Sequence, residues 1–259
     1  MRRMISLAAG TILDVDPATA VSVASAAGFP AVGIWHDPSR WSPRTTRDVA
    51  QRLADTGVVA LDVEPVIFGR GDHHGAAIIE IAAALNARFV LVASGAAPVT
   101  EVIPALARLC ELAATAAPEV TLVLEFLPIF SVGSLAAAVE AVRAVGAPNL
   151  GVLVDTLHLD RSGSAPADLA ADLDLFPYIQ LADAPRLVDA SPRALRDEAL
   201  HGRLLPGDGV LPLAEVLTAV PTVPISVELR SRALIEQYPA AVDRARAVLT
   251  ATRSLVDNL

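Results

Sequence analysis

The stretch "LVDTLHLDRSG" at residues 153–163 changes character abruptly. Two apolar residues that suit a sheet interior are followed at once by Asp155, with His158 and Arg161 close behind. A carboxylate and an imidazole can bind a metal ion or transfer protons, but burying them costs free energy unless they have a partner. The pattern becomes evidence for a chemical site if other strands of the chain end in the same way.

Several other apolar runs do end in polar residues. Earlier in the chain, runs end at His36 and Glu64, which could line a shared pocket. Four later, consecutive runs each deliver an oxygen-bearing side chain: Glu125, Asp155, Gln180 and Glu228. Two glutamates, an aspartate and an amide oxygen form a hard, mostly anionic set of ligands. We therefore expect them to bind one divalent cation such as Mn²⁺ or Mg²⁺.

The chain alternates between strand and helix patterns along its length, and these elements must position the polar residues. Each predicted strand is a short run rich in Val, Ile and Leu, as expected for strands buried on both faces. Ala-rich segments with helical composition lie between them. The predicted strands span residues 5–10, 31–36, 58–65, 89–95, 121–127, 150–156, 178–184 and 224–230.

Eight strands alternating with helices in about 250 residues predict an α/β fold, a closed (β/α)8 TIM barrel. Active sites of such barrels lie at the carboxyl ends of the strands, where the polar residues recur. An open doubly wound sheet is the alternative, but no GxGxxG motif follows the first strand. Because no linker or low-complexity segment interrupts the chain, we expect residues 1–259 to form a single TIM-barrel domain.

The bulk composition narrows the class of protein. Of 259 residues 53% are hydrophobic, yet no apolar run reaches the roughly 20 residues needed to span a bilayer. The short N-terminal apolar stretch leads into Asp14 and Asp16, so we expect no signal peptide, and a lone Cys110 suits a reducing cytoplasm. A net charge of −9 argues against nucleic-acid binding. We expect a cytoplasmic enzyme of small molecules, without a membrane partner; a homo-oligomer is left open.

The chain contains no lysine, since all 20 of its cationic side chains are arginine. This absence excludes a lysine Schiff base and a lysine general base. Carbon-acid chemistry in this protein must therefore use carboxylates, histidine or a metal ion.

The chain resembles the xylose-isomerase-like sugar phosphate isomerase/epimerase superfamily in the stretches "VLEF", "LVDTLHLDRSG", "YIQLADAP", "RLLPGDGVLPL" and "ISVELRS". That superfamily also includes ketose 3-epimerases, inosose isomerases and dehydratases, and 3-dehydroshikimate dehydratases. The resemblance is strong from about residue 120 to 232 and mainly architectural before that. These motifs are specific for the fold and the metal site, but they do not specify the substrate.

The resemblance implies roles for particular residues. It makes Glu125, Asp155, Gln180 and Glu228 the metal ligands, with His158 contacting a substrate oxygen. It also implies that Arg203, just before "PGDG", binds a substrate hydroxyl, carboxylate or phosphate. Many members have histidine where this chain has Gln180, whereas similar dehydratases can use glutamine. The lyase interpretation therefore stays open beside the epimerase one.

The expected reaction is an isomerisation or epimerisation of a sugar, sugar phosphate or cyclitol through an enediolate. A divalent ion bound to the substrate carbonyl and adjacent hydroxyl would acidify the neighbouring C–H. Glu125 and Glu228 would act as the acid/base pair on opposite faces of the substrate. If a leaving hydroxyl lies β to the carbanion, the same site would act as a dehydratase of the inosose or 3-dehydroshikimate type.

Less specific interpretations exist for the same residues. Asp155 could cap a turn, Gln180 could bind backbone, and the two glutamates could pair with Arg161 or Arg230. Asp183 could support the site from behind or hold a loop turn. A related endonuclease barrel needs a histidine-rich zinc cluster, which five histidines and a net charge of −9 fit poorly. A non-catalytic, metal-free sugar-binding barrel also remains.

The segment from Pro185 to Pro212 is long for a strand-to-helix connection. We expect it to cover the metal end of the barrel, with Arg203 donating a forked pair of hydrogen bonds to an oxygen-rich substrate group. The alternative is that Arg203 pairs with Asp208 or Glu198 on the loop surface.

Overall fold

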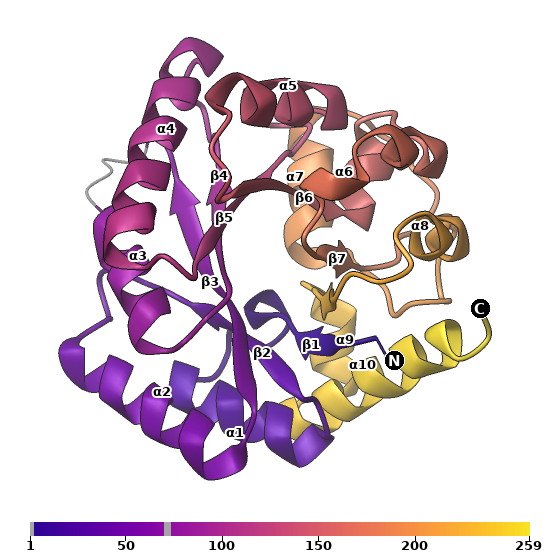
Figure 1. Ribbon diagram of the computed structural model, residues 1–259. Coiled ribbons are helices and arrows are strands. Elements are labelled where there is room, and N and C mark those ends of the chain that lie inside the picture. The colour runs from indigo at the N-terminus through magenta and orange to yellow at the C-terminus, as the bar shows by residue number, and fades with distance from the viewer. Residues whose placement is uncertain (1–2, 70–73) are drawn as a thin grey trace.

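The computed structural model, which describes residues 3–69 and 74–259, contains a closed barrel of eight parallel strands with helices around it (Figure 1). Each strand pairs with the next in sequence, and β8 closes the barrel on β1. The predicted (β/α)8 architecture is confirmed. The strands are β1 Ile5–Leu7, β2 Ala31–Trp35, β3 Val59–Ile67, β4 Phe89–Ala93, β5 Thr121–Glu125, β6 Leu150–Asp155, β7 Ile179–Leu181 and β8 Ile225–Val227.

Helices follow the strands and cover the outside of the barrel. Local chemistry defines several of their ends: Asp16 caps the first turn of α1, Ser42 caps α2, and Gly28 ends α1 with a φ of 90°, which glycine adopts without strain. The helices are α1 Pro17–Ala27, α2 Pro43–Thr56, α3 His74–Ala84, α4 Val99–Ala116, α5 Leu135–Val145, α6 Thr156–Arg161, α7 Pro192–His201, α8 Leu213–Ala219, α9 Arg232–Gln237 and α10 Ala241–Val256. Short 3₁₀ helices occur at η1 Ala9–Thr11, η2 Pro166–Ala171 and η3 Leu173–Leu175.

Two sets of buried apolar residues fill the molecule. The larger set lies between the strands and the helices. A smaller set fills the barrel interior and consists of Ala31, Leu61, Phe89, Leu91, Val123, Leu153 and Tyr178. Because side chains alternate between faces, the residue two positions after an interior residue also faces inward. This alternation carries Glu125, Asp155 and Gln180 to the inner face, after Val123, Leu153 and Tyr178.

A bulge in β3 changes which of its side chains face the interior. The single residue Gly33 of β2 lies opposite two residues of β3, Leu61 and Asp62, because the register shifts there. The extra residue reverses the alternation, so Asp62 and Glu64 face the same side as the interior. The strand also continues to Ile67, beyond the predicted end at residue 65.

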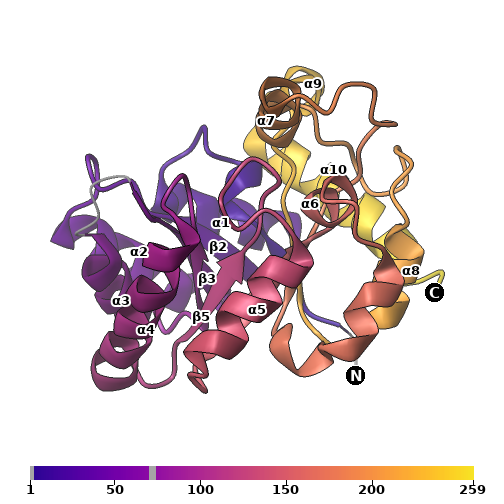
Figure 2. The ribbon, with the colours of Figure 1, turned by 90° about the horizontal axis from the view of Figure 1, so that it is seen from above.

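The segment after β7 contains a helix and a fastened turn. Within the expected loop of residues 185–212, α7 spans Pro192–His201, and Figure 2 shows α7 and α9 at the same end of the molecule. The "PGDG" turn is held by Asp183, which accepts hydrogen bonds from the backbone N–H groups of Gly207, Gly209 and Leu211 at 3.0 Å each. Asp183 therefore holds the loop turn, one of its two expected roles.

Among the described residues, no helix is both long enough and apolar enough to cross a membrane.

We predict that Asp183→Asn lowers the free energy of unfolding by about 2–4 kcal/mol. The amide NH₂ group would face backbone N–H donors that the carboxylate now accepts, because both oxygens of Asp183 are engaged. Urea denaturation measures the change. Asp189→Asn, at an exposed turn in the same segment, serves as the control with a change below about 0.5 kcal/mol. Equal stabilities of the two variants would contradict this role of Asp183.

Candidate functional site

The predicted site residues meet at the carboxyl ends of neighbouring strands. Glu125 is the last residue of β5 and Asp155 the last of β6, while Gln180 of β7 lies directly opposite Asp155. Glu228 follows β8 by one residue, and its backbone N–H donates to Leu181 at 3.1 Å. All four side chains are buried. The sequence therefore predicted correctly that these residues share one end of the barrel.

Three of the buried groups lie close enough to bind one ion. Glu125, Asp155 and His158 each offer one ligand atom, and these atoms lie within 4.8 Å of one another. Among the described residues, these three form the group of His, Cys, Asp or Glu side chains that is close enough to hold a metal ion. His158 Nε2 is 3.9 Å from Glu125 Oε1. The family resemblance implies a substrate contact for His158, and the geometry adds this side chain to the residues that could hold a metal ion.

Asp155 combines two of the roles considered from sequence. It is the N-cap of α6, where its Oδ1 accepts the His158 backbone N–H at 3.0 Å. Its Oδ2 accepts a hydrogen bond from Arg203 Nη1 at 2.5 Å. The abrupt change from apolar strand to polar helix at residue 155 is thus partly a helix start.

Arg203 has different partners from those that the sequence suggested. Its guanidinium is 2% exposed and donates to Asp155, while Nη2 lies 3.1 Å from Glu228 Oε2. Two predicted metal ligands accept from this fork in the structure, and the expected contact with a substrate group stays a prediction. The surface alternative is wrong, because Arg203 is buried and Glu198 pairs with Arg161 at 2.7 Å. Arg203 supplies a fixed positive charge behind the site.

The electrostatics of the site reflect many acids in a dry space. Burial, with the charges of Glu228 and Asp155, raises the pKa of Glu125 well above its usual value. Burial alone would raise the pKa of Asp155 too, but Arg203 brings it below its usual value. Burial lowers the pKa of His158 to about 4, so the imidazole is neutral near pH 7 and able to act as a ligand.

Gln180 supplies the observation that bears most directly on a metal ion. Neither its amide oxygen nor its amide nitrogen has a hydrogen-bond partner among the described residues, although the side chain is fully buried. An unpaired buried amide costs about 1–3 kcal/mol unless a ligand satisfies it. Together with the carboxylates of Glu125 and Asp155, the amide oxygen forms a donor set that fits a divalent cation.

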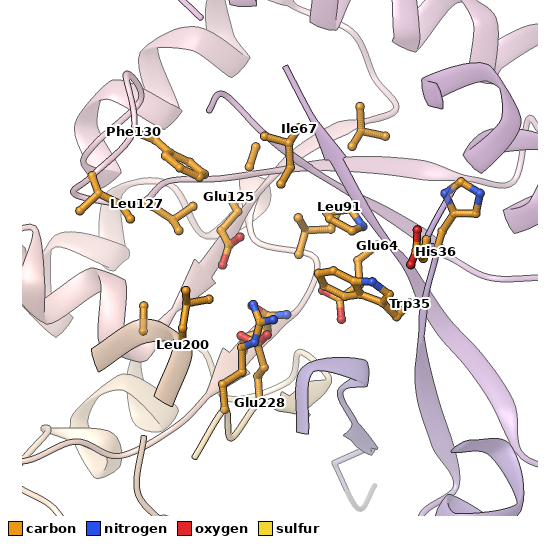
Figure 3. A pocket seen from close by; sticks show the side chains of 18 of the residues that line it. Trp35, His36, Glu64, Ile67, Leu91, Glu125, Leu127, Phe130, Leu200 and Glu228 are labelled. Atoms are coloured by element: carbon orange, nitrogen blue, oxygen red, sulfur yellow. The ribbon is translucent and has the colours of Figure 1, made fainter. Parts of the chain in front are cut away.

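Glu125, Gln180 and Glu228 line a cavity of about 590 Å³. Figure 3 shows Glu125 and Glu228 reaching into it from separate strands, with Phe130 and Leu127 on one side and Trp35 on the other. The predicted pocket residues Glu64 and His36 both line it, as do Arg196, Ala199 and Leu200 of α7. The helix in the 185–212 segment thus contributes a wall, as the sequence predicted in outline. The apolar wall was not predicted: Ile67, Leu91, Leu127, Ile129 and Phe130.

Another buried acid, Asp62, lies in the barrel interior, and the sequence did not indicate it. Asp62 is fully buried and accepts a hydrogen bond from the Tyr178 hydroxyl at 3.0 Å. Burial and the charge of Glu228 raise the pKa of Asp62 to about 7, against the lowering effect of the Tyr178 hydrogen bond. Its bulge-dependent orientation explains why strand alternation alone could not indicate it.

We predict that Asp62 makes the protein less stable as the pH rises. Its pKa is raised on folding, so its contribution is fully present below about pH 4 and is lost as the pH rises through about 7. Asp62→Asn stays neutral and still accepts from Tyr178. Urea titrations from pH 4 to 8 should therefore show wild-type protein losing stability relative to the variant, on the order of 4 kcal/mol. Parallel pH profiles would contradict the assignment.

Comparison with known proteins places this architecture in a family. A sequence model of the xylose isomerase-like TIM barrel family matches residues 21–252. No curated protein sequence matches the chain.

Three solved structures show the same fold. A zinc-bound IolI protein superposes with a TM-score of 0.83 at 19% identity, covering 98% of each chain. The probable 3-DHS dehydratase AsbF of Bacillus anthracis gives a TM-score of 0.76 at 16% identity, covering 96% of this chain and 98% of that one. A D-psicose 3-epimerase determined with D-fructose gives a TM-score of 0.72 at 14% identity, covering 98% and 99%.

At these identities the superpositions establish the fold, and the match of the sequence model establishes the relationship. That match runs from within α1 to within α10 and includes Glu125, Asp155, Gln180 and Glu228. The chain belongs to the xylose isomerase-like TIM barrel family.

Proposed function

We propose that this protein is a divalent-metal-dependent isomerase or epimerase of a small carbohydrate or cyclitol. The observation that carries the proposal is the fully buried, unpartnered amide of Gln180 beside the cluster of Glu125, Asp155 and His158. We assign Glu125, Asp155, Gln180 and Glu228 as the ligands of the ion. The IolI structure, which shares this fold and contains a bound zinc atom, supports a metal ion in this protein, although Mn²⁺ or Mg²⁺ also suits oxygen ligands.

The reaction follows from the positions of the two glutamates. When bound, the cation would polarise the substrate carbonyl and acidify the adjacent C–H. One glutamate removes that proton and the other returns a proton from the opposite face, because Glu125 and Glu228 enter the cavity from β5 and from the end of β8. Arg203 holds Glu228 in place, and its charge favours the ionised form of Asp155. Because its pKa is raised, Glu125 binds a proton more readily than an ordinary glutamate, which suits a group that both accepts and donates protons.

The residues that line the cavity are suited to a small polyhydroxylated substrate that has one less polar side. Glu64 and His36 lie at the edge that is opposite Phe130 and Leu127 (Figure 3). Polar groups at one edge can bind hydroxyls, and the apolar edge can pack against ring carbons. We assign Glu64 and His36 to substrate binding on this basis. An acidic protein with a net charge of −9 is suited to a small-molecule partner rather than to nucleic acid.

A metal-dependent dehydratase of the inosose or 3-dehydroshikimate type is the second candidate. It is favoured by Gln180 in place of the histidine of many relatives and by the apolar wall at Leu91 and Phe130. The superposition on AsbF agrees with this alternative at the level of the fold. Both candidates begin with the same proton abstraction, and they differ in whether a hydroxyl then leaves.

We predict that purified protein contains about one divalent ion per chain and that Gln180→Leu weakens its binding by about tenfold or more. Leucine has nearly the same size as glutamine but offers no oxygen. Titration of EDTA-treated protein with Mn²⁺ measures the affinity, and Gln237→Leu at the exposed end of α9 is the control. A metal-free protein whose properties are indifferent to EDTA would support a sugar-binding barrel instead.

We predict that Glu228→Gln preserves the fold and abolishes exchange of the substrate C–H with solvent deuterium. The amide cannot take up the proton, so exchange should fall by at least about 100-fold. Ketoses, inososes and 3-dehydroshikimate are the substrates to screen by mass spectrometry, and loss of water would identify a dehydratase. The metal content of the variant is measured in parallel, and Glu215→Gln on the exposed face of α8 is the control. Normal exchange in Glu228→Gln would remove Glu228 from the acid/base role.

A further inference from the structure

Glu228 lies beyond the last ladder residue of β8, so other contacts must fix it. The strand ends at Val227, and β7 beside it ends at Leu181. Glu228 itself makes one backbone bond to β7, from its N–H to Leu181. Its carbonyl accepts a second bond, from Arg203 Nη1 at 3.3 Å. A side chain that acts at a defined position needs its backbone held firmly on both sides.

The hydroxyl of Thr11 binds the backbone on both sides of Glu228. Thr11 Oγ1 donates to the Val227 carbonyl at 2.8 Å and accepts the Leu229 N–H at 2.8 Å. Thr11 lies in η1, immediately after β1, and is 2% exposed. The two bonds continue the β8–β1 pairing past the end of the strands. They lie on either side of Glu228, which we assign as a metal ligand and acid/base group.

The residue before Thr11 gives the Glu228 side chain its space. A Cβ atom at Gly10 would lie 2.8 Å from Cγ of Glu228 and closer still to a carboxylate oxygen. Real Cβ atoms essentially never approach other atoms so closely, so any larger residue here would displace the glutamate. Gly10 and Thr11 thus act on the same residue, one on its side chain and one on its backbone.

A buried arginine from the last helix fixes Thr11 in turn. Arg244 of α10 is fully buried, and its Nε donates to the Thr11 carbonyl at 3.3 Å. Its Nη1 donates to the Tyr238 carbonyl at 3.0 Å, and its Nη2 pairs with Asp14. A charged guanidinium is buried here at a cost that only well-placed acceptors offset. Its three partners connect the β1 loop to the segment that follows α9.

We infer that Thr11 is a positioning residue for Glu228, with Gly10 shaping its space and Arg244 anchoring the loop. The inference rests on the proposed function, because it gives Glu228 its role as a metal ligand. We call the two hydrogen bonds of Thr11 Oγ1 the brace. The expected consequence is that the brace affects the affinity for the metal ion itself, before any substrate binds. Contacts behind the ligands of metal sites commonly change affinity by about 10–100-fold.

The test compares Thr11→Val, which keeps the shape and removes the hydroxyl, with Thr11→Ser, which keeps the hydroxyl. The first readout is hydrogen exchange of the Leu229 amide, because this amide donates to Thr11 Oγ1. The second is the dissociation constant for Mn²⁺ with EDTA-treated protein. Thr252→Val is the matched control, since its hydroxyl is fully buried and bonds to Val248 within α10, away from the cavity.

We expect Thr11→Val to speed Leu229 exchange and to weaken Mn²⁺ binding, each by about tenfold or more. Thr11→Ser should restore both values to within about threefold of wild type, and Thr252→Val should change neither at this site. Unchanged Leu229 exchange in Thr11→Val would overturn the brace. Faster exchange with unchanged Mn²⁺ affinity would overturn its positioning role.

Two further variants keep the inference testable. Gly10→Ala leaves the threonine hydroxyl in place, so we expect weaker Mn²⁺ binding without faster Leu229 exchange, and it serves if Thr11→Val does not fold. Glu228→Gln should weaken Mn²⁺ binding on its own. If wild-type protein binds no Mn²⁺, or Glu228→Gln binds it normally, the proposed function fails, and the Leu229 exchange still decides whether the brace exists.

Discussion

Burying several carboxylates in the mouth of an apolar barrel creates a deficit of positive charge that the rest of the structure must meet. Glu64, Glu125, Asp155 and Glu228 are all buried there, and each ionised acid disfavours ionisation of the others. Arg203 compensates two of them directly. Burial and the neighbouring carboxylates still raise the pKa values of Glu64 and Glu125, although the charge of Arg230 lowers both and that of Arg203 lowers the second. A divalent cation would supply the remaining charge, which is why the electrostatics and the unpaired amide of Gln180 lead to the same proposal.

The strands that carry these groups are short on the β7–β8–β1 side, and side chains replace the missing ladder bonds. Thr11 encloses Glu228 between two hydrogen bonds. Thr156, next to Asp155, holds the backbone of Ala182 in a similar way. Its hydroxyl donates to the Ala182 carbonyl at 2.7 Å and accepts the Ala182 N–H at 2.9 Å. Asp183 fastens the turn that follows Arg203 in sequence. Rigid positioning of the site thus comes from hydroxyls and one carboxylate placed just beyond the strands, with the regular sheet below them.

The barrel could be predicted from the sequence because strands buried on both faces are continuous apolar runs. Runs of Val, Ile and Leu that end in an acid identified Glu125 and Asp155 as strand ends. It could not reveal the orientation of Asp62, because a bulge opposite Gly33 reverses the alternation on which such predictions depend. The partners of Arg203 were also out of reach, since they lie 48 and 25 residues away and ion pairs of that separation leave no local pattern. The role of Thr11 depends on contacts across 216 residues and is equally invisible in a single sequence.

The proposed function depends on one cation bound by four particular side chains. Anomalous diffraction from a crystal soaked in Mn²⁺ tests it most directly, because the signal locates the ion independently of any assumption about its ligands. We predict one strong peak at the carboxyl end of the barrel, with oxygens of Glu125, Asp155, Gln180 and Glu228 about 2.0–2.6 Å away. A strong peak elsewhere in the molecule, or no peak at this position under saturating Mn²⁺, would contradict the account.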